Sequence, residues 1–514
     1  MRFLAALGAT ALSGVLYGLA FPPASWRALG FVCLVPFLVA LRRVGPGAAL
    51  VLGFLWAEIA SVFVADALPW AVSSYFLQPL VASWVFSIFV WGVTGSLYTM
   101  AFAGAYRALA ARAVPALPLF GAAAWVATEL ARGRLLNASN FWAGNPWALL
   151  AYSQAGDGPL VQIASMTGVY GVSFVLVAVN AALAELVLRG KRSSWTGLPL
   201  AALPALAAWA WGAFELRGAD RAEPEAPAVR VAVVQANLDA GGRFDPSFYA
   251  RHLDEYLGLT LQAIEAGRPE IVFWPEGALT FPLADEPAFV RSIAQVLAEG
   301  GAELVAGGPR AEGSDPPVYF NSVFALGASG EIRGHYDKQL LVPFAERTPL
   351  SGLDLARREF GRVQSFTPGG PTPPLETRAG RAGILVCNEA MYPEVAAARA
   401  RDGAAYLVNP SNDTWIAKPK WARMMFDLVR LRAVEERRWL VRASTSGPSA
   451  IIDPWGRVRV ATEPGTREVI LGAIRPRTQL SVYARVGDLF GLACAVAVAA
   501  GVALRRPRAA GSPE

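Results

Sequence analysis

Histidine and cysteine are the scarcest reactive residues of this 514-residue chain, which has two histidines and three cysteines. Cys33 and Cys494 lie inside apolar runs, so only Cys387 lies in a polar part of the sequence. Thiols placed in this way cannot form a disulfide framework, and the Cys-x-x-Cys spacing of many zinc and redox sites is absent. The sequence predicts neither a metal site nor another cofactor.

Acidic residues are rare in the first 213 positions. Most of the other acids lie between residues 215 and 485. With 54% hydrophobic residues and a mean hydropathy of +0.37, the chain is too apolar for one soluble globule. With 17% charged residues, it is too polar to lie wholly in a membrane. We expect one half in the bilayer and one half in water. The acids of the first half are Glu58, Asp66, Glu129, Asp157 and Glu185.

Eight apolar runs approach the length of about 20 residues that a membrane helix needs. They predict a polytopic α-helical membrane domain at 1–213 with seven transmembrane helices. A soluble domain at 214–485 would follow, and then an eighth helix and a basic tail at 486–514. The runs lie near 3–21, 28–41, 47–67, 80–106, 116–131, 160–188, 196–213 and 486–504.

The net charge of +6 does not predict nucleic-acid binding, because the arginines gather in short loops between apolar runs. Such clustering sets membrane orientation, since basic loops stay in the cytoplasm. The sequence predicts cytoplasmic termini and a soluble domain outside the cytoplasm. The predicted inner segments contain Arg2, Arg42, Arg43, Arg107, Arg112, Arg189, Lys191, Arg192, Arg505, Arg506 and Arg508, and the outer loops only Arg27, Arg132 and Arg134.

The soluble half alternates short β-rich runs with longer helical ones. Several strand runs are apolar throughout, as in sheets that are covered on both faces. The pattern predicts a layered α/β sandwich. Predicted strands are 229–236, 270–274, 303–307, 322–326, 382–386, 404–408, 439–443 and 450–453, and predicted helices are 246–266, 286–299, 393–401 and 418–436.

Three segments of this half place a reactive side chain at or just after a strand. Ile271–Trp274 leads to Glu276, Ala382–Val386 leads to Cys387, and Lys338 opens an apolar loop. A carboxylate can take a thiol proton while an ammonium holds a developing oxyanion. The three residue types in these places indicate covalent acyl chemistry.

Other interpretations of the same residues remain open. Cys387 on its own could be a small buried hydrophobe. His335, three residues before Lys338, could instead form a Cys–His dyad, although no Asn or Asp that would orient it is evident. His252 lies in an amphipathic helical pattern that predicts a surface position.

The three segments resemble the signature of the nitrilase (carbon–nitrogen hydrolase) superfamily. They read Trp274-Pro275-Glu276, Lys338-Gln339-Leu340-Leu341-Val342-Pro343 through Glu346, and Cys387-Asn388-Glu389. With the flanking membrane helices, the chain resembles the bacterial apolipoprotein N-acyltransferase family along its whole length. Further matches are 408–415 and 432–453. The resemblance implies an α-β-β-α sandwich for the soluble domain.

The resemblance also implies roles for single residues. Cys387 would be the nucleophile, Glu276 the general base and Lys338 the oxyanion stabiliser. Glu346 and Glu389 would support them, together with Asn388. Two positions depart from the family pattern: Asn388 stands where an aromatic residue often follows the nucleophile, and Phe244 stands where a tryptophan is expected.

The implied reaction explains why such a site is joined to a membrane domain. A phospholipid, typically phosphatidylethanolamine, would give an acyl chain to Cys387 as a thioester. The α-amine of a diacylglyceryl-cysteine at the N-terminus of a lipoprotein would then take that chain as an amide. Water must be kept from the thioester, and lid or substrate-contact candidates are Phe244, Phe344, Tyr392, Asn412 and Trp415. The implied location is the bacterial inner membrane, with the catalytic domain on the periplasmic side.

Two rival functions use other parts of the same pattern. A membrane-anchored amidase would share Glu276, Lys338 and Cys387 but use water as the acyl acceptor. A transporter or scaffold could use Glu58 and Glu129, because ionisable residues inside membranes are often functional. The transporter reading lacks paired acids and a broken-helix repeat, so we expect an enzyme.

Overall fold

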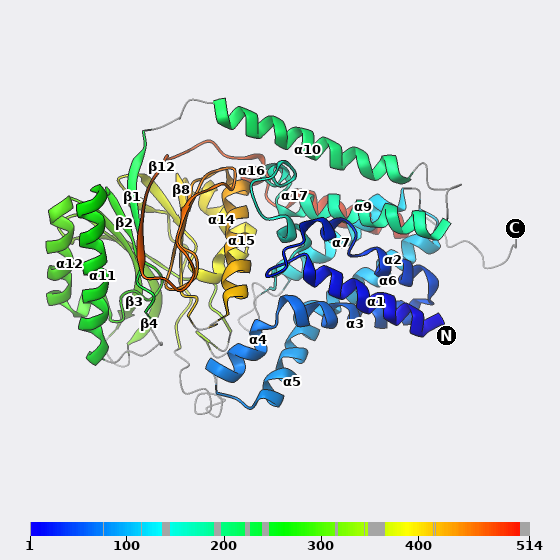
Figure 1. Ribbon diagram of the computed structural model, residues 1–514, viewed down its shortest axis with the longest axis horizontal. Helices are drawn as coiled ribbons and strands as arrows, with labels where there is room; N and C mark the ends of the chain where they lie inside the picture. Colours follow the sequence, from blue (N-terminus) through cyan, green and yellow to red (C-terminus); the bar gives the residue numbers. More distant parts are fainter. Residues whose placement is uncertain are drawn as a thin grey trace, which may run out of the picture.

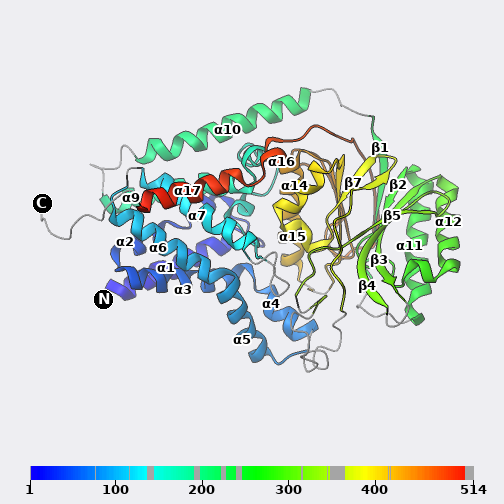
Figure 2. The same ribbon diagram turned by 180° about the vertical axis from the view of Figure 1, so that it is seen from behind.

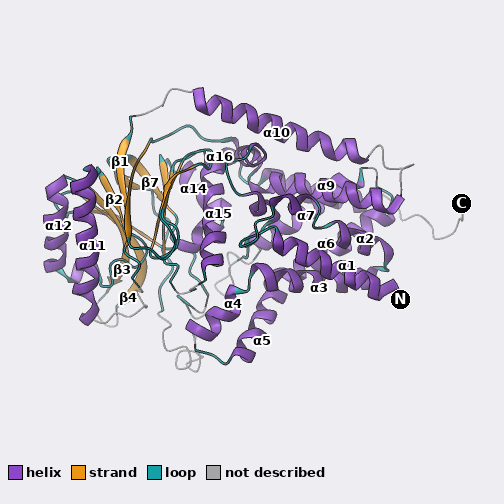
Figure 3. Ribbon diagram, in the orientation of Figure 1, coloured by secondary structure: helices purple, strands orange, loops and turns teal. Residues whose placement is uncertain are grey.

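The computed structural model has a helical half and a half built on two β-sheets (Figure 1). Secondary structure is seen most easily in Figure 3, where the strands lie between helices on both sides. The structure describes residues 2–75, 77–114, 116–135, 144–189, 197–221, 227–238, 246–313, 317–343, 345–347, 365–414, 416 and 418–503.

Each sheet of the second half has six strands. The first sheet has the order β12-β1-β2-β3-β4-β5 and the second β11-β10-β9-β8-β7-β6. In each sheet three neighbouring strands run parallel, β1-β2-β3 and β7-β8-β9, and the others pair antiparallel. The strands are β1 (Val229–Gln235), β2 (Ile271–Phe273), β3 (Glu303–Glu312), β4 (Val318–Leu326), β5 (Ile332–Asp337), β6 (Leu375–Thr377), β7 (Gly380–Ile384), β8 (Tyr406–Ser411), β9 (Leu440–Ser444), β10 (Ala450–Ile452), β11 (Val458–Ala461) and β12 (Glu468–Ile474).

Helices cover the outer face of both sheets, and this confirms the predicted α-β-β-α sandwich. Helices α11 (Pro246–Gly267) and α12 (Pro287–Gly300) lie on the first sheet, and α14 (Pro393–Arg401) and α15 (Pro419–Glu436) lie on the second (Figure 1). An apolar core fills the space between the sheets and includes Phe273 from the first and Val408 from the second. The inner strands β2, β8 and β9 are buried at every position, which explains their largely apolar runs.

The eight predicted strands and four predicted helices all exist, with ends shifted by a few residues. Four strands are missing from the prediction: β5, β6, β11 and β12. All four are edge strands of their sheets and carry exposed positions, so none is buried along its whole length like the strands that were predicted from apolar runs. None of the four residues of β11 is buried, so this strand lacks even an alternating pattern.

The helical half contains several long apolar helices. Among the described residues, four segments are long and apolar enough to cross a membrane, Pro46–Val64, Leu80–Ala111, Val169–Leu188 and Pro199–Asp220. Two shorter apolar helices are Phe3–Leu19 and Leu489–Ala503. The predicted count of eight transmembrane helices, and the domain limits at 213 and 485, stay predictions. The helices are α1 (Arg2–Leu19), α2 (Val35–Arg43), α3 (Pro46–Val64), α4 (Ala67–Trp70), α5 (Leu80–Trp91), α6 (Leu97–Ala111), α7 (Leu117–Arg134), α8 (Ala164–Thr167), α9 (Val169–Arg189), α10 (Gly197–Arg221), α16 (Val482–Val486) and α17 (Leu489–Ala503), and a π-helical segment, η3 (Gly92–Ser96), joins α5 to α6.

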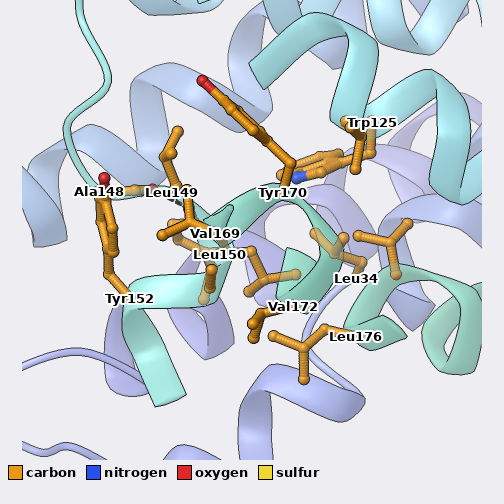
Figure 4. Packing of buried hydrophobic residues seen from close by; sticks show 14 of the residues in the cluster. Leu34, Trp125, Ala148, Leu149, Leu150, Tyr152, Val169, Tyr170, Val172 and Leu176 are labelled. Carbon is orange, nitrogen blue, oxygen red and sulfur yellow. Dashed lines mark hydrogen bonds between the residues drawn. The ribbon is translucent and has the colours of Figure 1, made fainter. Parts of the chain in front are cut away.

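One apolar core runs from the helical half into the helices on the second sheet. Its membrane side packs Trp125 of α7 and Leu176 of α9 against Leu149 and Leu150 (Figure 4). The same cluster continues through Leu428 of α15. The second sheet is therefore joined to the membrane half by continuous packing through α14 and α15.

Ring stacking and hydrogen bonds hold this junction together at several points. The rings of Trp147 and Trp421 stack with centroids 4.2 Å apart. Arg437 donates to Gln162 Oε1 at 2.7 Å, and the backbone N–H of Val169 donates to Glu435 Oε1 at 2.8 Å. Buried hydrogen bonds to charged groups are among the stronger ones, so we expect the two halves to behave as one rigid unit here.

Candidate active site

Glu276 follows the buried strand β2 at the edge where the parallel strands of the first sheet end. Its carboxyl is largely buried, and Oε2 accepts the backbone N–H of Asn412 at 2.8 Å. The neighbouring strand approaches closely at Gly307, where a Cβ would lie 2.6 Å from the Glu276 Cα. Only glycine fits at that position without a shift of the backbone, so the strand packing holds Glu276 in place.

Lys338 follows β5 directly and is almost completely buried, with 1% of its surface exposed. Its Nζ lies 3.2 Å from Glu276 Oε1 and 2.9 Å from Glu346 Oε1. Burial alone would lower the pKa of this amine, but the carboxylates of Glu276 and Glu346 outweigh it and raise the pKa. Lys338 is therefore held as an ammonium between two acids.

Cys387 begins a short 3₁₀ helix, η7 (Cys387–Met391), just beyond β7. Its backbone φ is +48°, a left-handed value that residues other than glycine rarely adopt. Asn409 holds this conformation, because its Nδ2 donates to the carbonyls of Leu385 at 2.6 Å and of Cys387 at 3.2 Å. Such strained positions often occur where a side chain must be aimed.

The thiol of Cys387 is buried, and the charges of Glu276 and Lys338 both act on it. Burial, and then the negative charge of Glu276, raise its pKa, while the ammonium of Lys338 acts in the opposite direction. A raised pKa means that the thiol keeps its proton near neutral pH, so a nucleophilic attack by this sulfur would need a base to remove that proton.

Behind Cys387 lies a buried ion pair that fixes Asn409. Arg442 Nη2 lies 2.6 Å from Asp413 Oδ2, and its Nη1 donates to Asn409 Oδ1. Ser444 donates to the same Asp413 oxygen at 2.5 Å. Because none of these groups is exposed to solvent by more than a few per cent, the network is rigid.

Glu346 and Glu389 lie where supporting residues would be. Glu346 Oε2 accepts the backbone N–H of Val342 at 2.7 Å, which closes the loop after Lys338. Glu389 is fully buried; its Oε1 accepts the backbone N–H of Gln339 at 2.7 Å and its Oε2 accepts that of Val386 at 2.8 Å. Glu389 therefore ties the lysine loop to the end of the cysteine strand.

Asn388 also connects the loop after Lys338 to the segment that begins at Cys387, because its Nδ2 donates to the Leu340 carbonyl at 3.1 Å. Of the predicted lid or substrate contacts, Asn412 lies beside Glu276. Tyr392 is buried and donates to the Gly144 carbonyl of the membrane half at 2.9 Å. Phe244, Phe344 and Trp415 lie outside the described residues.

Neither histidine joins the site. His335 is 44% exposed and faces Asp337, with 3.8 Å between Nε2 and Oδ2. His252 is buried in α11, so the predicted surface position is wrong. Helix α11 lies on the outer face of the first sheet, away from the core that contains Cys387.

Three polar residues of the site escaped the prediction. Asn321 of β4 donates to Glu276 Oε1 and to Glu346 Oε1, each at 2.7 Å. Tyr336 donates to Glu389 Oε1 at 2.8 Å, and Arg399 donates to the Tyr336 hydroxyl at 2.7 Å. Their sequence neighbours are ordinary strand and helix residues, so only the fold brings them to the site.

Two family models match the chain. The carbon–nitrogen hydrolase model covers residues 230–481, and the apolipoprotein N-acyltransferase N-terminal domain covers residues 13–182. The first match spans the two-sheet half and the second spans most of the helical half.

Curated relatives match the chain along most of its length. The apolipoprotein N-acyltransferase of Geobacter metallireducens is 33% identical over 507 residues, which cover 96% of this chain and 94% of the relative. That of Rhizobium meliloti is 33% identical over 496 residues, 89% of this chain and 88% of the relative. Among solved structures, the NitFhit protein of C. elegans aligns with a TM-score of 0.39 at 21% identity, over 49% of this chain and 61% of its own.

Proposed function

Because the chain belongs to the apolipoprotein N-acyltransferase family, we propose that Cys387 carries an acyl chain from a membrane phospholipid to a lipoprotein. The acceptor is the α-amine of the N-terminal diacylglyceryl-cysteine. One observation supports the site above all: a buried ammonium, Lys338, lies between two carboxylates and acts on the Cys387 thiol.

In the first half-reaction, Glu276 takes the thiol proton as the sulfur attacks the ester carbonyl of the phospholipid. The carbonyl oxygen becomes an oxyanion, which the ammonium of Lys338 stabilises. The oxyanion collapses, the C–O bond breaks, and the lysophospholipid oxygen takes the proton from Glu276. A thioester on Cys387 remains.

In the second half-reaction, the lipoprotein amine attacks the thioester carbonyl. Glu276 accepts a proton from the amine, Lys338 again faces the oxyanion, and the C–S bond breaks. The sulfur leaves and regains its proton from Glu276, so the enzyme returns to its starting state. The products are an amide and a free thiol, which gives ping-pong kinetics.

The protein is a bacterial membrane protein, and we propose the inner membrane with the two-sheet half on the periplasmic side. The start of α1 and the end of α17 lie at the end of the helical bundle that is away from the sheets (Figure 2). With the basic inner segments of the sequence, this supports cytoplasmic termini. We retain 1–213, 214–485 and 486–514 as the three parts of the chain.

A cavity in the membrane half supports phosphatidylethanolamine as the acyl donor. It opens between α3, η3, α6 and α7. Its wall carries Arg132, whose Nε has no partner among the described residues, and the carboxyl of Glu129. A guanidinium suits a phosphate, and a carboxylate with aromatic rings suits an ammonium group. The rings are Tyr17, Trp56, Trp91, Tyr98, Trp125 and Trp147.

A transfer assay with two substrates tests the proposed function. Purified protein would receive phosphatidylethanolamine with labelled acyl chains and a diacylglyceryl peptide with a free α-amine. We expect label on the peptide as an amide and little free fatty acid. Label released mainly as free fatty acid would support the amidase alternative and contradict the proposal.

A further inference from the structure

Asn321 contacts both carboxylates of the thiol site through its side chain and the backbone of Lys338 through its carbonyl, without being charged itself. It lies in β4 opposite Pro309 and is buried, with 8% of its surface exposed. Its Nδ2 lies 2.7 Å from Glu276 Oε1 and 2.7 Å from Glu346 Oε1. Its backbone carbonyl accepts the N–H of Lys338 at 2.8 Å.

The amide and the ammonium close a ring of four contacts. Both nitrogens face the same two oxygens, Oε1 of Glu276 and Oε1 of Glu346, with Lys338 at 3.2 and 2.9 Å and Asn321 at 2.7 Å from each. A primary amide has two N–H donors, so both are used. The amide oxygen could not take this place, because it would face two carboxylates.

The two donors respond differently when the base works. Once Glu276 has taken the thiol proton, it is neutral and its attraction to Lys338 falls, which leaves the ammonium free for the oxyanion. The N–H of Asn321 still finds an acceptor, because a protonated carboxyl keeps acceptor capacity. The backbone N–H of Asn412 holds the other oxygen in the same way.

We propose that Asn321 is a positioning residue that holds the Glu276 carboxyl in place through both of its protonation states while Lys338 turns to the oxyanion. Without Asn321, Oε1 of each acid depends on Lys338 alone. The ammonium then stays engaged with the carboxylates, and Glu276 is less well placed to take and return the proton. The predicted effect of Asn321 on acyl transfer rests on the proposed function. Its predicted effect on the reactivity of the Cys387 thiol does not.

The test compares Asn321→Ala with the wild type and with Val318→Thr, an exposed position of the same strand. The first readout is the rate of acyl-enzyme formation from phosphatidylethanolamine in a single turnover. We expect Asn321→Ala to lose about 10- to 100-fold, the range for a hydrogen bond to a charged group. Val318→Thr should match the wild type.

The second readout needs no lipid. Iodoacetamide alkylation of Cys387, followed by peptide mass, reports how readily the thiol loses its proton. At pH 7.5 we expect Asn321→Ala to be alkylated several-fold more slowly than the wild type, and at pH 10 the two rates should converge because hydroxide then removes the proton. A loosened fold would instead expose the thiol and speed alkylation at every pH.

The outcomes separate the two proposals. An Asn321→Ala variant with a wild-type acylation rate, or with alkylation equal to or faster than wild type at pH 7.5, overturns the role of Asn321. A wild-type protein that forms no acyl-enzyme overturns the proposed function, while the alkylation rates still decide on Asn321. Asn321→Asp provides a further check, since it keeps the shape but replaces donors by a carboxylate and should lose more activity at pH 8 than Asn321→Ala.

Discussion

The Tyr392 hydroxyl donates a 2.9 Å hydrogen bond to the carbonyl of Gly144, and this joins the segment after the nucleophile to the membrane half. Tyr392 directly follows η7, the short helix that begins at Cys387. The short helix that begins at Cys387 is thereby tied to Gly144 of the membrane half. The segment after the nucleophile and the membrane half are thus linked by a direct hydrogen bond as well as by the chain.

Tyr392→Phe removes this link and keeps the ring. We expect the apparent melting temperature in detergent to fall by a few degrees, since one buried hydrogen bond contributes about 1 kcal/mol. Acyl transfer should fall more than stability explains. Tyr406→Phe is the matched control, because it also removes a buried hydroxyl contact, to Thr377 at 2.8 Å, but away from the membrane half. Equal losses of transfer in both variants would contradict the link.

Lys338→Met removes the ammonium and keeps most of the volume. We expect thioester formation to fall by about 10²- to 10³-fold, as for other oxyanion donors. The melting temperature should fall as well, because Glu276 and Glu346 would face each other without a cation. Lys338→Arg keeps the positive charge, so we expect it to restore more of the melting temperature than of the rate of thioester formation. A Met variant within tenfold of the wild-type rate would remove Lys338 from the oxyanion site.

The raised pKa of the Cys387 thiol predicts a slow reaction with alkylating agents in the absence of substrate. A raised pKa means that the thiol keeps its proton to higher pH, so its thiolate fraction at pH 8 is lower than that of free cysteine, whose pKa is about 8.5. We expect the alkylation rate of Cys387 to rise with pH and to reach no plateau below about pH 10. A plateau below pH 8 would show a low-pKa thiolate and contradict the assignment of a separate base.

Glu129→Gln tests the headgroup cavity, since it keeps the shape and the oxygen that accepts Leu150 N–H at 2.9 Å. We expect use of phosphatidylethanolamine to fall about tenfold relative to phosphatidylglycerol, which lacks an amine. Arg132→Gln should reduce use of both lipids, because both carry the phosphate. Arg107→Gln is the control, as Arg107 binds the Val44 carbonyl outside the cavity. An unchanged lipid ratio in Glu129→Gln would exclude Glu129 from headgroup recognition.

The layers of the fold and the principal side chains of the candidate site could be predicted from the sequence because buried apolar runs lead to them. The residues that lead to Glu276 and Cys387, at 271–273 and 382–384, are apolar and buried, and such runs are easy to recognise. Strand β5, which places Lys338, was missed because its first half is exposed and polar. Lys338 itself was found from the apolar loop that follows it.

Contacts between distant strands could not be predicted in the same way. Asn321 lies 45 residues from Glu276 and 25 from Glu346 in the sequence. Its sequence neighbours give no sign that its amide contacts these two acids. His252 lies three residues after Tyr249 and four before Tyr256, so it falls on the apolar face by which α11 packs, and this explains its burial. Contacts between side chains that are distant in the sequence can be identified only in the folded structure.

The mass of the protein after incubation with phosphatidylethanolamine alone tests the central claim most directly. We expect the wild type to gain the mass of one acyl chain, to carry it on the peptide that contains Cys387, and to lose it to hydroxylamine as a thioester does. Cys387→Ala should fold and stay unmodified. No mass gain in the wild type, or the same gain in the Ala variant, would contradict Cys387 as the acyl carrier.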